Sequence, residues 1–149
     1  MNHIALRSAV VSAIVLGSTF VPVGAQAKSV EGSVLSLVNV TRADAGCEPL
    51  RLDHRLNRAA SAHSADMSRR GYFSHTTPEG VTFGERIRRA GYPKPGAENI
   101  ARGQTSARQV VDDWLASSGH RENIVNCELR AVGIGVSPDG QYWTQDFGY

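Results

Sequence analysis

Net charge is scarce in this sequence: 16 lysines and arginines stand against 14 aspartates and glutamates, which leaves a formal charge of +2 over 149 residues. A balance so close to neutral argues against a general nucleic-acid binder, which needs a strongly basic surface. The one local concentration of positive charge, at Arg86, Arg88 and Arg89, is predicted to be a solvated helix face and not a phosphate site. The chain has no internal repeat, and its length suits one domain.

Long apolar runs are scarce as well, and the one present lies near the N-terminus, from Ala9 to Val23. It is followed by Ala25-Gln26-Ala27, which matches the small-x-small pattern that signal peptidase cleaves. We therefore expect residues 1–27 to be a signal peptide and residues 28–149 to be a single secreted domain. The alternative is an uncleaved membrane anchor, for which the run is shorter than the usual span of about 20 apolar residues. No second run of this kind follows, so we expect no transmembrane anchor.

Cysteine is limited to Cys47 and Cys127. Export would place both residues in an oxidising compartment, where an even count predicts a disulfide; two buried free thiols are the alternative. The bond would close a loop of about 80 residues, which contributes roughly 4 kcal/mol in the chain-entropy model. No cysteine lies at the expected cleavage site, so the usual lipid attachment to an N-terminal cysteine is not available. A catalytic cysteine is not expected in this setting.

The spacing of apolar residues predicts helices followed by a C-terminal hairpin. The expected helices cover residues 30–45, 53–70, 83–90 and 107–118, with Asp53, Thr82 and Thr105 or Ser106 as N-terminal caps and Gly46, Gly71, Gly91 and Gly119 as stops. Residues 97–101 are expected to be extended, and residues 131–136 and 141–147 are expected to form the hairpin around a turn at 137–140. The predicted fold class is α+β, with helices flanking a small antiparallel sheet.

Histidines are the first candidates for a functional site. His75 and His120 are each expected in a loop just past a helix end, where functional groups concentrate. His63 falls in the apolar stripe of the second helix and is expected to be a core residue and not a ligand. His54 lies in a polar stretch at a helix start and is expected at the surface.

Two glutamates lie between His75 and His120 in the sequence. Glu98 stands in the otherwise small or apolar run Ala97–Ile100, and a carboxylate on a buried strand needs partners because unpaired burial is costly. Glu85 is ambiguous, because Thr82-x-x-Glu85 is also a capping box, in which Glu85 returns to the Thr82 backbone. We give the structural and the functional interpretation of Glu85 equal weight.

Two imidazoles and two carboxylates suit Zn²⁺ or another divalent cation, or general acid–base chemistry near neutral pH. Spacing alone supports such a site only weakly, because these four residues are far apart in the chain. The sequence has no H-E-x-x-H metal signature, no G-x-S-x-G nucleophile elbow and no glycine-rich phosphate loop.

Several blocks of the sequence, taken in order, resemble the CAP superfamily of cysteine-rich secretory proteins, antigen 5 and plant pathogenesis-related proteins, in its compact bacterial form. The blocks are Phe73–His75, Ala97–Ala101, Trp114–Ile124, Gly133–Val136 and Tyr142–Gly148, and the similarity extends from Val34 to Gly148. The chain departs from the family pattern in two ways. Ala97 replaces a glycine that is common before the Glu-Asn pair, and the cysteine-rich extension of many eukaryotic members is absent.

The resemblance implies an α-β-α sandwich with a central cleft lined by a tetrad of two histidines and two acids. By motif, these residues are His75, Glu98, His120 and Glu85, the last at a position that varies between Asp and Glu in bacterial members. Family members have been reported to bind zinc or other divalent ions at the tetrad. If Zn²⁺ binds here, we expect the two imidazoles to be its direct ligands and the two glutamates to orient them.

These observations predict a secreted binding module that holds a divalent cation, such as Zn²⁺, and an extracellular ligand, which would be a lipid or sterol, a glycan or a protein. The alternative is a metal-dependent or acid–base hydrolase, protease-like, that acts outside the cytoplasm. A third possibility is an interaction protein with a vestigial cleft. We expect a monomer that binds no nucleic acid, with Trp114 and Trp143 in structural roles.

Overall fold

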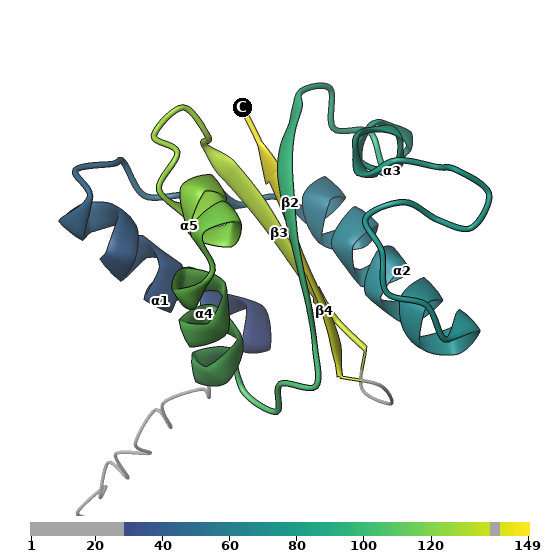
Figure 1. Cartoon of the computed structure of the whole chain (residues 1–149). Coiled ribbons are helices and arrows are strands. Elements are labelled where there is room, and N and C mark those ends of the chain that lie inside the picture. The colour runs from purple at the N-terminus through teal and green to yellow at the C-terminus, as the bar shows by residue number, and fades with distance from the viewer. Residues whose placement is uncertain (1–28, 138–140) are drawn as a thin grey trace, which may run out of the picture.

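The structure is a computed structural model that describes residues 29–137 and 141–149. The predicted signal peptide and residues 138–140 of the predicted turn lie outside the described residues. Within them, a sheet separates two groups of helices (Figure 1). One face is covered by α1 (Val30–Asp44), α4 (Ala107–Ala116) and α5 (Ser118–Ile124), and the other by α2 (His54–Arg70) and α3 (Phe83–Arg89). The expected α+β sandwich is confirmed.

The sheet has the strand order β1-β3-β4-β2, so that β2 forms one of its edges. Its strands are β1 (Arg51–Leu52), β2 (Pro95–Arg102), β3 (Ala131–Val136) and β4 (Tyr142–Gly148). The β3–β4 hairpin and the β2–β4 pair are antiparallel, as expected. The strand β1 was not predicted, and it pairs in parallel with β3, which makes the sheet mixed. A strand of two residues is too short to show an alternation of apolar and polar residues. Its position is therefore set by its pairing with β3.

The helix α2 begins and ends where the sequence predicts. The carboxylate of Asp53 accepts a hydrogen bond from the backbone N–H of Arg55, and Gly71 ends the helix with a left-handed φ of 69°. The buried side of the helix consists of Leu56, Ala59, Ala60, His63, Ser64 and Met67. This side lies directly on β3, where a Cβ atom at Gly133 would come within 2.0 Å of the Leu56 backbone. Only glycine permits this approach.

The opposite face of the sheet carries the main apolar core. Within it, Trp114 of α4 is 1% exposed, and its Nε1 donates a hydrogen bond to the Ile100 carbonyl of β2. Trp143 of β4 is also buried, and its Nε1 donates to the Gln104 carbonyl at 2.9 Å. Both tryptophans therefore have the structural surroundings that the sequence predicts.

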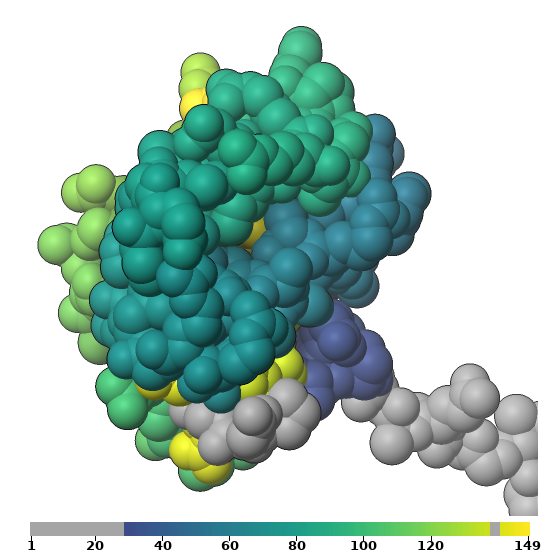
Figure 2. All heavy atoms as spheres, turned by 90° about the vertical axis from the view of Figure 1, so that its right-hand side faces the viewer, coloured from purple at the N-terminus to yellow at the C-terminus, as the bar shows by residue number. Residues whose placement is uncertain are grey.

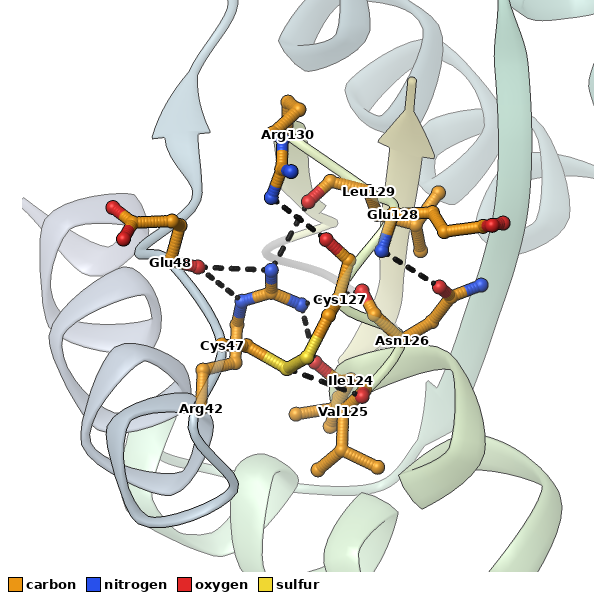
Figure 3. The surroundings of a disulfide bond; sticks show 10 residues. All are labelled: Arg42, Cys47, Glu48, Ile124, Val125, Asn126, Cys127, Glu128, Leu129 and Arg130. Atoms are coloured by element: carbon orange, nitrogen blue, oxygen red, sulfur yellow. Dashed lines mark hydrogen bonds between the residues drawn. A yellow bond between two sulfur atoms is a disulfide. The ribbon is translucent and has the colours of Figure 1, made fainter.

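The predicted disulfide between Cys47 and Cys127 is present (Figure 3). It connects the end of α1 to the segment that follows α5. Beside it, the fully buried Arg42 donates hydrogen bonds to four main-chain carbonyls, those of Glu48, Ile124, Asn126 and Leu129. The disulfide and Arg42 thus join the same two regions of the chain.

The prediction for α4 was wrong at its C-terminal end. The helix ends at Ala116 and not at Ser118, Ser117 is extended, and a separate helix, α5, begins at Ser118. Gly119 therefore lies inside α5 and is not a stop, and His120 lies on a helix and not in a loop. Burial of Ile124 and the bonds from Arg42 to the end of α5 stabilise this second helix. Both depend on residues far away in the sequence.

The described helices include none that is both long enough and apolar enough to cross a lipid bilayer.

Candidate functional site

Glu98 occupies the middle of β2, and no part of its side chain is exposed. Its Oε1 lies 2.8 Å from Nδ1 of His75, and its Oε2 accepts a hydrogen bond from Arg86 at 2.5 Å. Burial disfavours the charged form, but the hydrogen bond from His75 and the charge of Arg86 leave the pKa of Glu98 below its ordinary value. The prediction that this carboxylate requires partners is confirmed.

His75 lies in the loop after α2, and 51% of its side chain is exposed. Because an ionised carboxylate can only accept a hydrogen bond, the Nδ1 that faces Glu98 carries the proton of the neutral ring. The other ring nitrogen, Nε2, then keeps its lone pair. The pairing with Glu98 therefore leaves His75 with one ring nitrogen able to bind a cation or a proton.

The loop that carries His75 is held by its main chain. His63 is buried in α2, as expected, and its Nε2 donates to the carbonyl of Ser74 at 2.9 Å. Arg86 donates to the carbonyl of His75 itself at 2.8 Å. Burial lowers the pKa of His63, so its ring is neutral at physiological pH. His63 thus positions the loop and does not face solvent.

Arg86 was not expected in the site. Arg88 and Arg89 are exposed, as predicted for a solvated face, but the side chain of Arg86 is only 12% exposed and turns inward from α3. Besides Glu98 and His75, its guanidinium contacts the Val81 carbonyl at 3.1 Å. The prediction treated three neighbouring arginines as one group, whereas Arg86 precedes the fully buried Ile87 and lies at the border of the helix's buried side.

Asp146 is the second site residue that the sequence analysis missed. It lies directly opposite Glu98 in the β2–β4 pair, so both carboxyl groups point to the same face of the sheet. Its side chain is fully buried, and burial together with the negative charge of Glu98 raises the pKa of Asp146 well above its ordinary range. Asp146, like Glu98, is a carboxyl group in a buried strand, so the same sequence signal marks it.

His120 approaches β2 from the opposite face, on α5. Asn99, the residue after Glu98, donates to the carbonyl of His120 at 3.2 Å, and Asn123 donates to the side-chain oxygen of Asn99 at 2.8 Å. Burial, with a smaller contribution from the charge of His75, lowers the pKa of His120. The two histidines are therefore close enough to interact electrostatically.

Glu85 lies at the start of α3, and its carboxylate is occupied there. It accepts hydrogen bonds from the backbone N–H and the hydroxyl of Thr82 at 2.8 and 2.9 Å, which completes the capping box. These bonds lower the pKa of Glu85. The structure thus places Glu98 with His75, places His120 across β2, and engages Glu85 in the helix cap.

The donor set limits what could be held here. In residues 29–137 and 141–149, no three histidine, cysteine, aspartate or glutamate side chains gather in a way that would hold a metal ion. A cation at this site would therefore rest on two imidazoles and on water or a ligand from outside the chain. Zn²⁺ accepts such a set, since it takes imidazole nitrogen at about 2.0–2.1 Å and tolerates open positions.

Two grooves adjoin these residues. A groove of about 650 Å³ lies between α2 and α3, with His63, Arg86 and Arg89 among its walls. Figure 2 shows a hollow between these helices, in which a small area of yellow atoms is visible. A smaller groove of about 300 Å³ lies on the other side of the site and is lined by His120 and the half-exposed Phe73.

Comparisons with known proteins agree with this architecture. The model of the family described as "CAP: Cysteine-rich secretory protein family" matches residues 35–147. The uncharacterized protein YkwD of Bacillus subtilis is 37% identical over 118 residues, which are 78% of this chain and 46% of that protein.

Two solved structures have the same fold. An extracellular SCP-domain protein of Bacillus anthracis aligns with a TM-score of 0.73 and 32% identity, over 79% of this chain and 39% of that one. An outer surface protein of Borrelia burgdorferi aligns with a TM-score of 0.69 and 22% identity, over 77% of this chain and 88% of that one. The chain spans less than half the length of the two Bacillus relatives.

Proposed function

The chain belongs to the cysteine-rich secretory protein (CAP) family, and from this premise we propose that it is an extracellular binding module that holds a divalent cation, such as Zn²⁺, between the imidazoles of His75 and His120. One observation carries the proposal: the 2.8 Å contact between Nδ1 of His75 and Oε1 of the fully buried Glu98. A histidine whose other ring nitrogen is held by a carboxylate is the arrangement that metal-binding histidines use.

The protonation states of the two histidines support this proposal. In the neutral ring of His75 the proton lies on Nδ1, toward Glu98, which leaves the Nε2 lone pair free, and the lowered pKa of His120 favours its neutral ring. Metal ions bind neutral imidazole and not imidazolium, so both side chains are ready to act as ligands near neutral pH. The bound cation would supply a positive charge with open coordination positions.

The two glutamates have different parts in the proposal. Glu98 has both oxygens engaged, with His75 and Arg86, so it orients a ligand and does not bind the cation itself. Glu85 acts only as a flanking negative charge, because Thr82 occupies its carboxylate.

An extracellular location is supported by three features. The disulfide requires an oxidising compartment to persist. The N-terminal segment has the pattern of a signal peptide. The two structural relatives are described as an extracellular protein and an outer surface protein. The grooves beside Arg86 and His120 would give an extracellular lipid or sterol, glycan or protein access to the site. No specific observation in the described residues favours the hydrolase alternative, and we do not adopt it.

Calorimetric titration with zinc tests the proposal. We expect the double variant His75→Ala/His120→Ala to lose zinc binding, while His54→Ala, which removes an exposed histidine of α2, keeps the wild-type affinity. Glu98→Gln should weaken binding about tenfold, which is the lower end for loss of a carboxylate behind a metal-binding histidine. Binding to the wild type should weaken as the solution is acidified, because protonated imidazole cannot bind zinc. Equal zinc affinity in the wild type and the double variant would overturn the proposal.

A further inference from the structure

Beneath His75 lies a cluster of buried polar atoms that have no hydrogen-bond partner among the described residues. They are Nδ1 of His63, Nε of Arg86 and both carboxyl oxygens of Asp146. Buried polar groups are nearly always satisfied in folded proteins, so a group of such atoms in one place requires an explanation. All three side chains interact electrostatically with Glu98, which places them around a single carboxylate.

The surroundings of Asp146 do not suit a negative charge. Glu98 faces it from β2 with its own negative charge, Arg86 of α3 is the one cation among its electrostatic partners, and Gly133 lies opposite it on β3 and has no side chain. His63 of α2 is neutral, because burial lowers its pKa. The single positive charge of Arg86 already balances Glu98. A second buried anion that receives no hydrogen bond would be costly.

A neutral Asp146 removes this conflict, because a carboxylic acid has a proton to donate. Glu98 is the acceptor within the same cross-strand pair, and an ionised carboxylate can accept more hydrogen bonds than the two from His75 and Arg86. We propose that Asp146 is a carboxylic acid that donates its proton to Glu98, and that it acts through Glu98 as a positioning residue for His75. The raised pKa of Asp146 agrees with this assignment.

The shared proton affects His75. Three donors, from His75, Arg86 and Asp146, then divide the charge of Glu98. The hydrogen bond from Asp146 thereby helps to fix the Glu98 carboxylate in the orientation in which its Oε1 faces Nδ1 of His75. The importance of this effect for cation binding rests on the proposed function, whereas the proton on Asp146 does not.

Infrared spectroscopy of the metal-free protein at neutral pH tests the proton directly. A protonated carboxyl group has a C=O stretch that is separate from the bands of ionised carboxylates. We expect one such band in the wild type, its loss in Asp146→Asn, and its retention in Asp113→Asn, which alters an exposed aspartate of α4. If the wild type lacks the band, or Asp146→Asn keeps it, the proposal is wrong.

Nitrogen-15 NMR of the His75 ring, again without metal, tests the positioning role. In Asp146→Asn the amide N–H can donate the same hydrogen bond to Glu98, so the Nδ1–H of His75 should stay hydrogen-bonded to Glu98, as in the wild type. In Asp146→Leu the donor is lost and the orientation of Glu98 is no longer fixed, so the signal of the His75 Nδ1–H that is hydrogen-bonded to Glu98 should weaken several-fold. Equal behaviour of the Asn and Leu variants would overturn the positioning role.

The two tests also separate this inference from the proposed function. If Asp146→Leu does not fold, the infrared comparison still decides whether Asp146 carries the proton. If the wild type shows the acid band but binds no zinc, the proposed function fails and the proton assignment stands.

Discussion

Two arginines turn inward in the part of the chain that the structure describes, and their surroundings are different. Arg42, beside the disulfide, makes five hydrogen bonds, all to main-chain carbonyls (Figure 3), and a guanidinium has five N–H groups to donate. Arg86, beside the histidine site, donates to two carbonyls and to the carboxylate of Glu98, and its Nε has no acceptor among the described residues. One cation is fully satisfied by the backbone, and the other depends on an ionisable partner.

The difference separates a structural region from a functional one. Backbone carbonyls do not titrate, so the region around Arg42 keeps the same hydrogen bonds at every pH at which the protein is folded. The region around Arg86 contains two carboxyl groups and two histidines, and its hydrogen bonds change with their protonation. A fully satisfied cluster has nothing left to offer a ligand, whereas an incompletely satisfied one does.

Loss of Arg42 should have the largest effect on stability. Arg42→Met would remove the hydrogen bonds to four main-chain carbonyls, of which those to Ile124 and Leu129 are buried, and at about 1–3 kcal/mol for each carbonyl left without a donor we expect a loss of about 5 kcal/mol. Urea denaturation measures this loss, with Arg88→Met as the control, because Arg88 is exposed on α3. A loss no larger than that of the control would contradict the structural role of Arg42.

Removal of the disulfide should cause the next largest loss of stability. Cys47→Ala/Cys127→Ala opens a link between residues 80 positions apart, and we expect a loss of about 4 kcal/mol through the greater entropy of the unfolded chain. Under conditions where this variant is folded, zinc titration should give the wild-type affinity, because neither cysteine takes part in the hydrogen bonds that hold His75 and His120. A change in zinc affinity without a change in stability would mean that the disulfide region serves binding and not structure, which contradicts the comparison.

Arg86 should contribute less to stability and more to binding. Arg86→Met leaves Glu98 with His75 and Asp146 as partners, so we expect a stability loss of about 2 kcal/mol, less than for a buried charge left entirely unpaired. Zinc affinity should fall about tenfold, as for other residues that orient a metal-binding histidine. Arg86→Lys should recover part of the stability and part of the zinc affinity. Arg89→Met, on the same helix, should change neither the stability nor the zinc affinity. Urea denaturation and calorimetry together decide whether Arg86, unlike Arg42, contributes more to zinc binding than to stability.

The smallest expected effect is a pH-dependent change in stability when Asp146 is replaced. Its pKa is raised in the folded state, so the stability linked to its proton is fully present below the unfolded pKa of about 3.9 and is lost as the pH rises through the folded value. Asp146→Asn does not titrate, so its stability relative to the wild type should increase as the pH rises. Thermal unfolding from acid to mildly alkaline pH measures this difference. A difference that does not vary with pH would mean that Asp146 is ionised in the folded protein.

Much of the fold could be predicted because its signals are local. The cap at Asp53 and the stop at Gly71 bound α2 within a single stretch of sequence, and the alternation of residues 131–136 marks β3. The strand β1 and the helix α5 carry no such signal. The first has two residues, and the second is held by the buried Arg42, which lies 82 residues from Ile124 in the sequence.

The site was predictable in part for the same reason. Glu98 stands out as a carboxylate in an apolar strand, and the family resemblance identifies His75 and His120. Arg86 was missed because its role depends on partners in other elements. Asp146 could have been noticed as a carboxyl group in a buried strand, like Glu98, but not its pairing with Glu98. No local pattern shows that Asp146 lies opposite Glu98, since that pairing is set by the register of β4 against β2.

The sequence by itself determined which stretches become helix or strand, that two cysteines were available to pair, and that Glu98 required partners. Only the tertiary structure decided which partners it received and what became of each arginine. Arg42 and Arg88 are the same residue type on amphipathic helices, yet one is fully buried and the other exposed. The physical reason is that the cost of burying a charge is set by the groups around it, and packing of distant segments brings those groups together.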